Sequence, residues 1–405
     1  MEDNYLCIKC KGKGLCGKKC PILNKFKIKN LKKTYFSSSL PPEIFVSTYN
    51  YPNVNSGILS PEEYGDTSYY SSSEIWYKNN YDIEKILFLR SNLIYSKFKT
   101  KIKYDQKNKF LEIAKEISLT NKPVSAEIFL LKPIKNKILI NNYYPVIGNP
   151  APLKNIRLGE NIKTERKAEY LLNDIDVKAE DAIIELYKSK LKIEQIIRLL
   201  SVGNLGRKKE RKLVPTRWSI TATDDIISRK LLEKIKTYQE ISEILVFNSY
   251  YIGNHYEFIL IPDKFSFEVI EAKLTGSVWN PNMPTYFAID YEDFYGRKKY
   301  AKNVTGAYYA NRLALCEYLK KIKRQAACLV IRECRKEYYA PCGVGVLREA
   351  SRGAFSKEAE RFSSLKDAFE VIQKRLKLPI KNFIEKSWLI KKYKEQKKIT
   401  YYLSN

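Results

Sequence analysis

Residues 244–273, ILVFNSYYIGNHYEFILIPDKFSFEVIEAK, carry the pattern that decides the fold class. Runs rich in β-branched and aromatic residues alternate there with turn-forming residues such as Gly253, Asn254 and Asp263. This pattern is typical of strands joined by short turns. It predicts three strands of an antiparallel sheet, at residues 244–248, 256–262 and 265–273.

Segments with helical periodicity precede and follow these strands in the sequence. Apolar residues recur every three or four positions between residues 161 and 200, and Gly203 is typical of a helix end. Further helices are predicted at residues 225–238, 308–324, 364–375 and 381–394. Short strands are predicted at residues 126–131, 137–141 and 328–334, a helix or strand–helix mixture at 81–95, and a loop-rich stretch at 37–73. This order predicts an α+β fold, an irregular mixed α/β arrangement.

Composition and motifs predict four parts in the chain. We expect a small zinc module at residues 1–25, a sheet-containing central α/β domain at 26–292, a mostly helical C-terminal domain at 293–385 and a basic tail at 386–405. No apolar run is long enough for a membrane span, and the start of the chain lacks the pattern of a secretory signal. We therefore expect a soluble, cytoplasmic protein that associates with the nucleoid.

The charge of the chain favours a polyanionic partner. The 405 residues include 73 Lys or Arg and 45 Asp or Glu, a formal net charge of +28. Such an excess attracts nucleic acid. The alternative is a lysine-rich composition that merely coats the surface, because lysine is also enriched in thermophilic proteins.

Four cysteines lie close together near the start of the chain. Cys7, Cys10, Cys16 and Cys20 have the spacing C-x2-C-x5-C-x3-C, with glycines between them. Four thiolates at such spacing suit a tetrahedral structural zinc ion, Zn(2+). Two disulfides and an iron–sulfur cluster are the alternatives. The other cysteines, Cys316, Cys328, Cys334 and Cys342, are expected to be buried small side chains.

The most distinctive motif of the chain is LVPTRWSITATDD, residues 213–225. In this motif Arg217 and Trp218 combine a phosphate-binding group with a ring that stacks on bases. In the alternative interpretation, Asp224 or Asp225 caps the following helix. A basic run precedes the motif and is either a solvated loop or a nucleic-acid contact: Arg207, Lys208, Lys209, Arg211 and Lys212.

At these motifs the chain resembles the Nre family of archaeal DNA repair proteins. The resemblance rests on LVPTRWSITATDD, on PPEIFVSTYNYPNVNSG from Pro41, on GRKKYAKNVTGAYYANRLALCEYL from Gly296, on GVGVLREASR from Gly343 and on the cysteine cluster. It implies a role in the DNA damage response and binding to the sliding clamp PCNA. It implies no established reaction, so we expect a non-catalytic, DNA-binding repair factor.

The last residues of the chain fit the clamp-binding pattern. Such peptides follow Q-x-x-h-x-x-a-a, where h is aliphatic and a is usually aromatic. QKKITYYL places Gln396, Ile399, Tyr402 and Leu403 in these positions, with Leu at the last one. We therefore predict a PCNA-binding (PIP-like) motif in the basic tail. The alternative is a basic helical tail with a frayed aromatic end.

A metal-dependent nuclease of PD-(D/E)xK type is the alternative function. Pro262-Asp263 and Glu271-Ala272-Lys273 follow the order of that motif, in which carboxylates bind Mg²⁺ and a lysine assists catalysis. The pattern is permissive, and Asp263 equally suits a hairpin turn. The single histidine, His255, has no second histidine with which to form a metal pair or relay, and we expect it to be structural.

Overall fold

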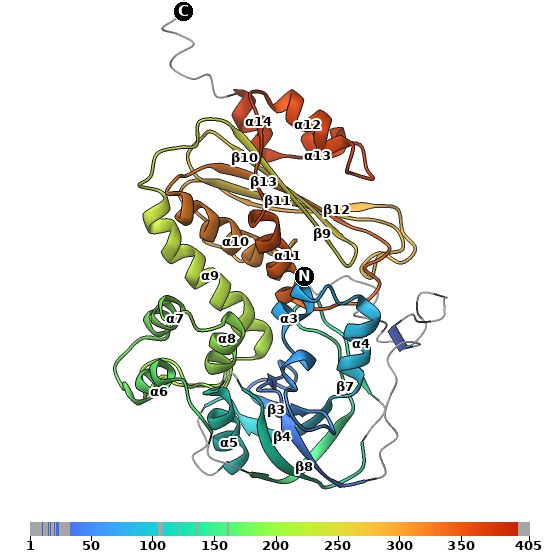
Figure 1. Ribbon diagram of the computed structural model, residues 1–405, viewed down its shortest axis with the longest axis vertical. Coiled ribbons are helices and arrows are strands. Elements are labelled where there is room, and N and C mark those ends of the chain that lie inside the picture. The colour runs from blue at the N-terminus through green and yellow to red at the C-terminus, as the bar shows by residue number, and fades with distance from the viewer. Residues whose placement is uncertain are drawn as a thin grey trace, which may run out of the picture. The chain divides into compact units, whose positions relative to one another are not determined.

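The computed structural model describes residues 33–103, 108–120, 122–134, 137–159 and 162–395, together with Cys10, Leu15, Gly17, Cys20, Ile22 and Leu23. The chain divides into two compact units. Of the described residues, the N-terminal unit contains those up to 227 and 340–346, and the C-terminal unit contains 228–339 and 347–395. Each unit has its own mixed sheet and its own helices (Figure 1), which confirms the α+β fold class.

The N-terminal unit is built on a sheet with the strand order β1-β5-β8-β4-β3-β2. All neighbouring strands are antiparallel except β4 and β8, which are parallel. The strands are β1 (Tyr35–Leu40), β2 (Ile44–Val46), β3 (Asn53–Ser60), β4 (Ile94–Lys101), β5 (Val124–Leu130) and β8 (Pro150–Leu158). A small separate pair is formed by β6 (Ile138–Leu139) and β7 (Ile147–Gly148).

One face of this sheet packs on helices and forms the core of the unit. Leu111, Ala114 and Ile117 of α5 lie in the same apolar cluster as Ile58, Ile94 and Ile128 of the sheet. The helices of the unit are α3 (Ser73–Lys78), α4 (Ile83–Ser91), α5 (Lys109–Ser118), α6 (Arg166–Asn173), α7 (Ala179–Lys188) and α8 (Ile193–Ser201), with a 3-10 turn η1 at Ser68–Tyr70. The predicted helical periodicity over residues 161–200 is thus confirmed by α6, α7 and α8, and the mixture at 81–95 by α4 and β4.

The expectation of a loop-rich stretch at residues 37–73 was only partly right, because it missed the strands there. This stretch supplies most of β1 and all of β2 and β3. Its serines misled the prediction, because Ser38, Ser56 and Ser60 are fully buried at core-facing positions where larger apolar residues are typical of strands. Small side chains fit those positions, so the strands lack the apolar runs by which strands are recognised.

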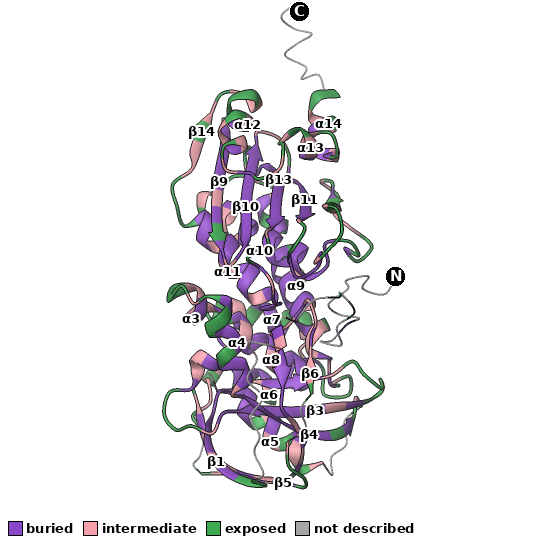
Figure 2. Ribbon diagram, turned by 90° about the vertical axis from the view of Figure 1, so that its right-hand side faces the viewer, coloured by how far each residue is buried: buried purple, intermediate pink, exposed green. Residues whose placement is uncertain are grey.

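The C-terminal unit is built on a second sheet, with the order β12-β11-β13-β10-β9-β14. β11 and β13 are parallel, and all other neighbours are antiparallel. The strands are β9 (Ile244–Tyr251), β10 (Asn254–Ile261), β11 (Ser266–Lys273), β12 (Tyr286–Glu292), β13 (Ala327–Cys334) and β14 (Glu360–Phe362). Figure 2 shows β10, β11 and β13 buried along their length, as expected of strands covered on both faces.

Helices cover both faces of this second sheet. α10 (Gly306–Ile322) and the end of α11 (Val344–Phe355) lie against one face, where Tyr318 and Phe355 pack around the ring of Phe247. α12 (Leu365–Gln373), α13 (Lys381–Ile384) and α14 (Trp388–Glu395) lie on the other face (Figure 1). The predicted helices at 308–324 and 364–375 are confirmed, and the one at 381–394 is two helices, since residues 385–387 separate α13 from α14.

The predicted antiparallel order of the first three strands was only partly right. β9 and β10 form the expected hairpin, but β10 and β11 are not neighbours. β13, which follows much later in the chain, lies between them and pairs with both. Its eight residues are all buried, so a central position in the sheet is taken by a strand that is distant in sequence. Strands adjacent in sequence usually pair, and local patterns do not reveal such an insertion.

Helix α9 (Thr216–Ile235) begins nine residues before the predicted start at residue 225. Pro215 precedes it, and the Pro215 carbonyl accepts a hydrogen bond from the Ser219 N–H at 3.0 Å. The hydroxyls of Ser219 and Thr221 donate to backbone carbonyls of the preceding turn. Asp224 is fully buried within the helix, so the interpretation of Asp224 or Asp225 as a helix cap was wrong.

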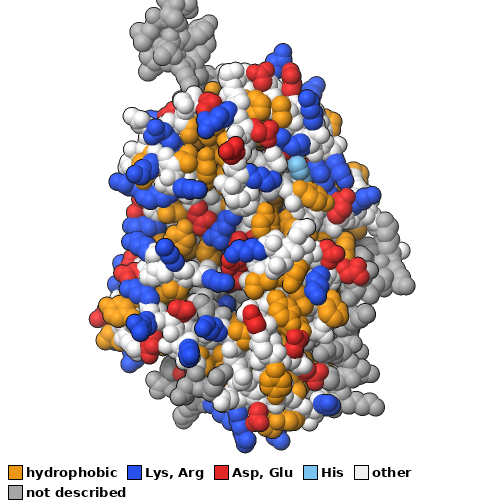
Figure 3. Space-filling view, in the orientation of Figure 1, with side chains coloured by type: hydrophobic (Ala, Val, Ile, Leu, Met, Phe, Trp, Pro, Cys, Tyr) orange, Lys and Arg blue, Asp and Glu red, His pale blue; other side chains and the backbone are white. Residues whose placement is uncertain are grey.

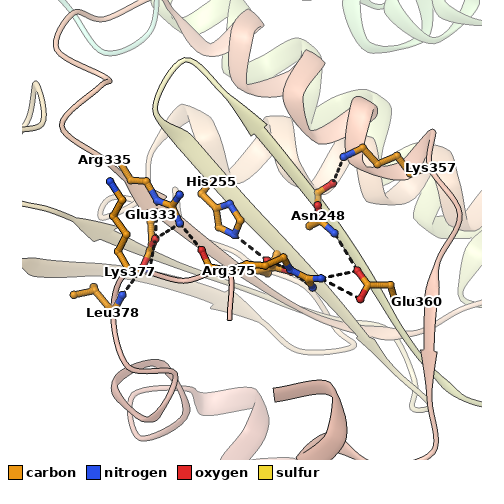
Figure 4. A network of polar contacts seen from close by, with 10 residues as sticks. Asn248, His255, Glu333, Arg335, Lys357, Glu360, Arg375, Lys377 and Leu378 are labelled. Atoms are coloured by element: carbon orange, nitrogen blue, oxygen red, sulfur yellow. Dashed lines mark hydrogen bonds and ion pairs between the residues drawn. The ribbon is translucent and has the colours of Figure 1, made fainter. Parts of the chain in front are cut away.

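A polar network attaches the segment after α12 to the sheet of the C-terminal unit (Figure 4). The guanidinium of Arg375 donates to Glu257 of β10 at 2.8 and 2.9 Å and to Glu360 of β14 at 2.8 and 3.0 Å. His255 Nε2 lies 2.8 Å from Glu257 Oε1, and Glu333 accepts the backbone N–H groups of residues 377 and 378. His255 is therefore part of a buried structural network, as the sequence indicated.

The cysteines outside the N-terminal cluster are confirmed as buried side chains. Cys316, Cys328, Cys334 and Cys342 are fully buried, and burial raises the pKa of each thiol. A thiol with a raised pKa is a poor nucleophile and a poor metal ligand at neutral pH. Among the described residues, no helix combines the length and the apolar character that a membrane crossing requires.

Candidate nucleic-acid interface

Net charge alone does not single out a binding surface on this protein. On the face drawn in Figure 3, Lys and Arg side chains are interspersed with Asp and Glu over both sheets and their helices. Interspersed charges produce weaker fields than a patch of one sign. A candidate interface therefore has to be found from local geometry, where basic side chains gather without carboxylates between them.

Such a gathering lies along β4 in the N-terminal unit. Its sequence around residues 97–103 is KFKTKIK; β4 ends at Lys101, and after a bend at Ile102 the chain forms an isolated bridge at Lys103. Because side chains alternate along a strand, Lys97, Lys99 and Lys101 lie on one side, and the exposed Lys103 follows them beyond the bend. Phe98 and Ile102 point to the other side and pack in the core. We call these four residues the lysine row; it spans about 20 Å at the usual rise of a strand.

The strands beside the lysine row add polar and basic groups. Asn55 and Asn53 of β3 lie opposite Lys99 and Lys101. On the other side, Lys103 lies opposite Lys212 in an antiparallel bridge, and the Leu213 N–H donates to the Ile102 carbonyl at 2.8 Å. Directly opposed like charges repel one another, so this pair is stabilised when an anion lies between the two ammonium groups.

A hollow opens at the other end of the row. β4 and β8 pair only over Tyr95–Lys97 and Pro150–Pro152. After Lys97 and Pro152 the two strands are no longer paired, and the first residues of α5 lie between them. The hollow has a volume of about 760 Å³. Its basic lining residues are Lys97, Lys99, Lys109 and Lys132, its aromatic ones are Phe98 and Phe110, and no carboxylate is among the described residues that line it.

The predicted contacts in the basic run 207–212 separate into two groups. Arg207, Lys208, Lys209 and Lys212 are exposed, although Arg207 lies 3.5 Å from Glu210. Arg211 is instead half-buried, and its guanidinium donates to backbone carbonyls at the end of α6 and nearby: Gly206, Leu171, Leu172 and Asp174. Cations are favourable at a helix C-terminus, so the contacts of Arg211 are those of a structural residue.

Arg217 and Trp218, predicted to act together, point to different surroundings. The Arg217 guanidinium lies 4.3 Å from the centre of the ring of Tyr143, which is itself buried. Trp218 is 44% exposed and its ring lies 5.3 Å from that of Tyr51. Trp218 and Lys212 therefore border the solvent-exposed basic surface, whereas Arg217 is held against an aromatic ring of the core.

The nuclease alternative is not supported by the geometry of its residues. Asp263 lies in the turn before β11, where its carboxylate accepts the Lys264 N–H, whereas Glu271 lies near the other end of that strand. Glu271 is fully buried and accepts hydrogen bonds from Lys273 and Arg332. Burial by itself raises the pKa of Glu271, but the charges of Arg332 and Lys273 outweigh burial and lower it. Both oxygens of this carboxylate are used in an internal ion-pair network.

Two predicted sites fall largely on residues outside the described part of the chain. These are Cys7 and Cys16 of the cysteine cluster, and Gln396, Ile399, Tyr402 and Leu403 of the tail. Cys10 and Cys20 are described, and the Cys10 sulfur accepts a hydrogen bond from the Leu15 N–H at 3.3 Å. Among the described residues, no group of three or more His, Cys, Asp or Glu side chains is placed to hold a metal ion.

The lysine row was missed in the sequence because it looks like an ordinary strand. Lysines that alternate with Phe98, Thr100 and Ile102 are the pattern of any half-buried strand with a solvated face. The available signal was the absence of an acidic residue from 94 to 104. Only the fold shows that Asn53, Asn55 and Lys212 lie beside that strand.

Comparison with known proteins places these features in a family. The family model described as "Archaeal Nre, N-terminal" matches residues 15–280, and "Archaeal Nre, C-terminal" matches residues 292–402. The chain is 34% identical to DNA repair protein NreB of Archaeoglobus fulgidus, over 96% of this chain and 98% of the relative. It is 36% identical to DNA repair protein NreA of the same organism, over 91% and 93% of the two chains.

A third relative comes from another archaeon. The chain is 35% identical to DNA repair protein NreA of Haloferax volcanii, over 85% of this chain and 84% of the relative. No solved structure matches the chain significantly. The sequence relatives therefore carry the assignment.

The different contacts of Arg211 and Lys209 predict different effects of substitution. Arg211→Ala removes a charged donor from several partly buried carbonyls and should lower the free energy of unfolding by about 1–3 kcal/mol. Lys209→Ala, at an exposed position of the same run, should change it by less than about 0.5 kcal/mol. Urea denaturation followed by circular dichroism measures both. Equal effects of the two substitutions would contradict the structural role of Arg211.

Proposed function

The chain belongs to the archaeal Nre family, and from that premise we propose that it is a DNA repair factor that binds DNA through the basic face of its N-terminal unit. We define the basic face as the lysine row together with Lys212 and the two further lysines that line the hollow, Lys109 and Lys132. The relatives that cover nearly the whole chain are named DNA repair proteins. A repair factor has to reach its lesions on DNA, and a basic surface provides that contact.

The lysine row is the single observation that carries this proposal. Each lysine that neutralises a phosphate releases condensed counterions, and this release drives most sequence-independent binding. The row spans about 20 Å, over which one strand of B-DNA carries about six phosphates. The asparagines of β3 lie alongside and supply neutral donors for further phosphate oxygens. Contacts of this kind position a protein on DNA without reading its sequence.

The backbone of this face is fixed before any ligand binds. The lysine-bearing strand pairs with β3 along its whole length and is anchored from below by core residues such as Phe98. Binding therefore has to order only the lysine side chains, since the strand itself is already ordered. A preformed surface of this kind suits a factor that has to bind DNA of any sequence.

We further propose that the tail docks on the sliding clamp PCNA. Gln396, Ile399, Tyr402 and Leu403 follow the clamp-binding pattern, and the resemblance to the Nre family points in the same direction. Residues 371–405 contain ten Lys or Arg and two Glu, which suits a partner that encircles DNA. In this arrangement the clamp recruits the protein to replication forks, and the basic face binds the DNA there.

A structural zinc ion is the third part of the proposal. The N–H group that points at the Cys10 sulfur stabilises a thiolate, the form in which cysteine binds zinc. Gly17, between the last two cysteines, has φ +69°, a conformation that glycine adopts without strain and that lets a short segment turn around an ion. Cys7, Cys10, Cys16 and Cys20 would hold the ion, which supplies folding energy to a segment with few apolar residues.

Replacing three lysines of the row tests the DNA-binding proposal. We expect the triple variant Lys99→Ala, Lys101→Ala, Lys103→Ala to bind a duplex oligonucleotide more weakly, because up to three phosphate contacts are lost. The slope of log K against log salt should become shallower by about 0.9 for each contact removed. Fluorescence anisotropy titrations at several salt concentrations measure both quantities.

The matched control removes the same charge elsewhere on the same unit. Lys178, Lys188 and Lys190 are exposed at the two ends of α7, and their triple replacement by alanine should leave affinity and salt slope close to those of the parent. If both triple variants lose the same affinity, binding depends on net charge and the lysine row is not the interface.

The clamp proposal predicts that Tyr402→Ala with Leu403→Ala abolishes binding to purified PCNA, because both side chains of the apolar anchor are removed. Tyr401 lies at a position of the pattern that any residue can occupy, so Tyr401→Ala is the matched control and should retain binding. Isothermal titration calorimetry gives the affinities. Unchanged affinity of the double variant would refute the assignment of the tail.

The zinc proposal predicts about one zinc ion per chain, lost when Cys7 and Cys10 are both replaced by serine. Cys316→Ala, which alters a buried cysteine distant in sequence, should leave the metal content unchanged. Elemental analysis of the purified proteins by mass spectrometry measures the ion. A parent protein without metal, or one that contains iron, would refute the assignment.

A further inference from the structure

Exposed aromatic side chains lie at one end of the lysine row. Tyr49 and Tyr51, in the loop between β2 and β3, are 76% and 47% exposed, and Trp218 is 44% exposed. The other tryptophans, Trp76, Trp279 and Trp388, are buried or half-buried. The Tyr51 and Trp218 rings lie 5.3 Å apart at an angle of 60°, so they are tilted and neither covers the face of the other.

The backbone connects this aromatic pair directly to the lysine row. Pro52, which follows Tyr51, accepts a hydrogen bond from the Ile102 N–H, between Lys101 and Lys103. The Ile102 carbonyl accepts the Leu213 N–H, five residues before Trp218. Three segments, 51–53, 101–103 and 212–218, are therefore neighbours, and the aromatic pair borders the last lysines of the row.

The position of Trp218 is fixed by the turn that carries it. The Thr216 hydroxyl accepts the Val46 N–H at 2.9 Å and lies 3.3 Å from the Ser201 hydroxyl, and Ser219 is fully buried. The first turn of α9 is thus anchored through the residues on either side of Trp218. A ring on an anchored turn loses little conformational freedom when a ligand stacks on it.

The segments that carry the pair and the lysine row contain basic but no acidic residues. Residues 47–55, 94–104 before Asp105 and 211–223 contain no acidic residue, and they contribute all four lysines of the row, Lys212 and Arg217. Exposed aromatic rings beside lysines are the combination used by proteins that bind single strands, because the bases stack and the phosphates pair with the lysines. In a duplex the base faces are covered by neighbouring bases, so a stacking ring finds no partner there.

We propose that Trp218 and Tyr51 form a stacking platform that makes single-stranded DNA the preferred ligand of the basic face. This assignment rests on the proposed DNA-binding function and adds the class of substrate. A single strand runs with its phosphates along the lysine row and at least one base against the aromatic pair. The platform carries no charge, so it contributes to affinity for single strands without contributing to the salt dependence of binding.

The test compares a 20-nucleotide oligothymidylate with a 20-base-pair duplex on the full chain. Trp218→Ala with Tyr51→Ala should weaken binding of the single strand about tenfold or more, and leave binding of the duplex and the salt slope unchanged. Trp218→Phe should retain most of the affinity, because a smaller ring still stacks. Tyr64 is 66% exposed in the same unit, and Tyr64→Ala is the matched control that should change neither affinity.

The other outcomes separate this inference from the function on which it rests. Unchanged affinity for the single strand, or an equal loss for single strand and duplex, overturns the stacking platform. Tighter binding of oligouridylate than of oligothymidylate overturns the assignment to DNA. If the triple variant of Lys99, Lys101 and Lys103 keeps full affinity for both DNAs, the proposed basic face itself is refuted, whatever the aromatic variants show.

Discussion

The alternation of side chains along β4 is the constraint on which the surface of the N-terminal unit depends. The strand is held in register by β3, and its apolar residues, Phe98 among them, are part of the core. A shift by one residue would bury the lysines and expose the apolar side chains, at a cost of several kcal/mol for each buried unpaired charge. The burial of the core therefore also determines where the lysines point. Stability and the presentation of charge are two consequences of the same register.

The C-terminal unit shows the opposite use of charge. Arg332, Lys273 and Glu271 are all buried, and the Glu271 carboxylate pairs with both Lys273 of β11 and Arg332 of β13. A charge that is removed from water has to be compensated by a partner of opposite sign, and this network supplies one. The motif Glu271-Ala272-Lys273 thus places both side chains on one side of a strand, as a nuclease motif would. Arg332 lies on that side, where a nuclease would need an open position for a metal ion.

The sequence was informative where local patterns determine structure. The helices over residues 161–200 were predictable because their apolar positions recur at helical spacing, and β9 and β10 because a turn at Gly253 separates two apolar runs. The start of α9 was not predictable, because serine and threonine are poor helix formers unless their hydroxyls find carbonyl partners. The insertion of β13 depends on packing between distant segments. For the same reason Arg211 was taken for a ligand contact, although its partners are carbonyls of α6, nearly forty residues away in the sequence.

The first turn of α9 contains residues with two separate roles: some hold the fold together, and one forms part of the surface. Thr216 and Ser219 face the unit and are satisfied by hydrogen bonds, so folding accounts for them. Trp218, between them, contacts Tyr51 and solvent, and an exposed tryptophan leaves a large apolar area in contact with water. In the proposed stacking platform, a ligand that carries both negative charge and aromatic groups covers this ring and pairs with the neighbouring lysines.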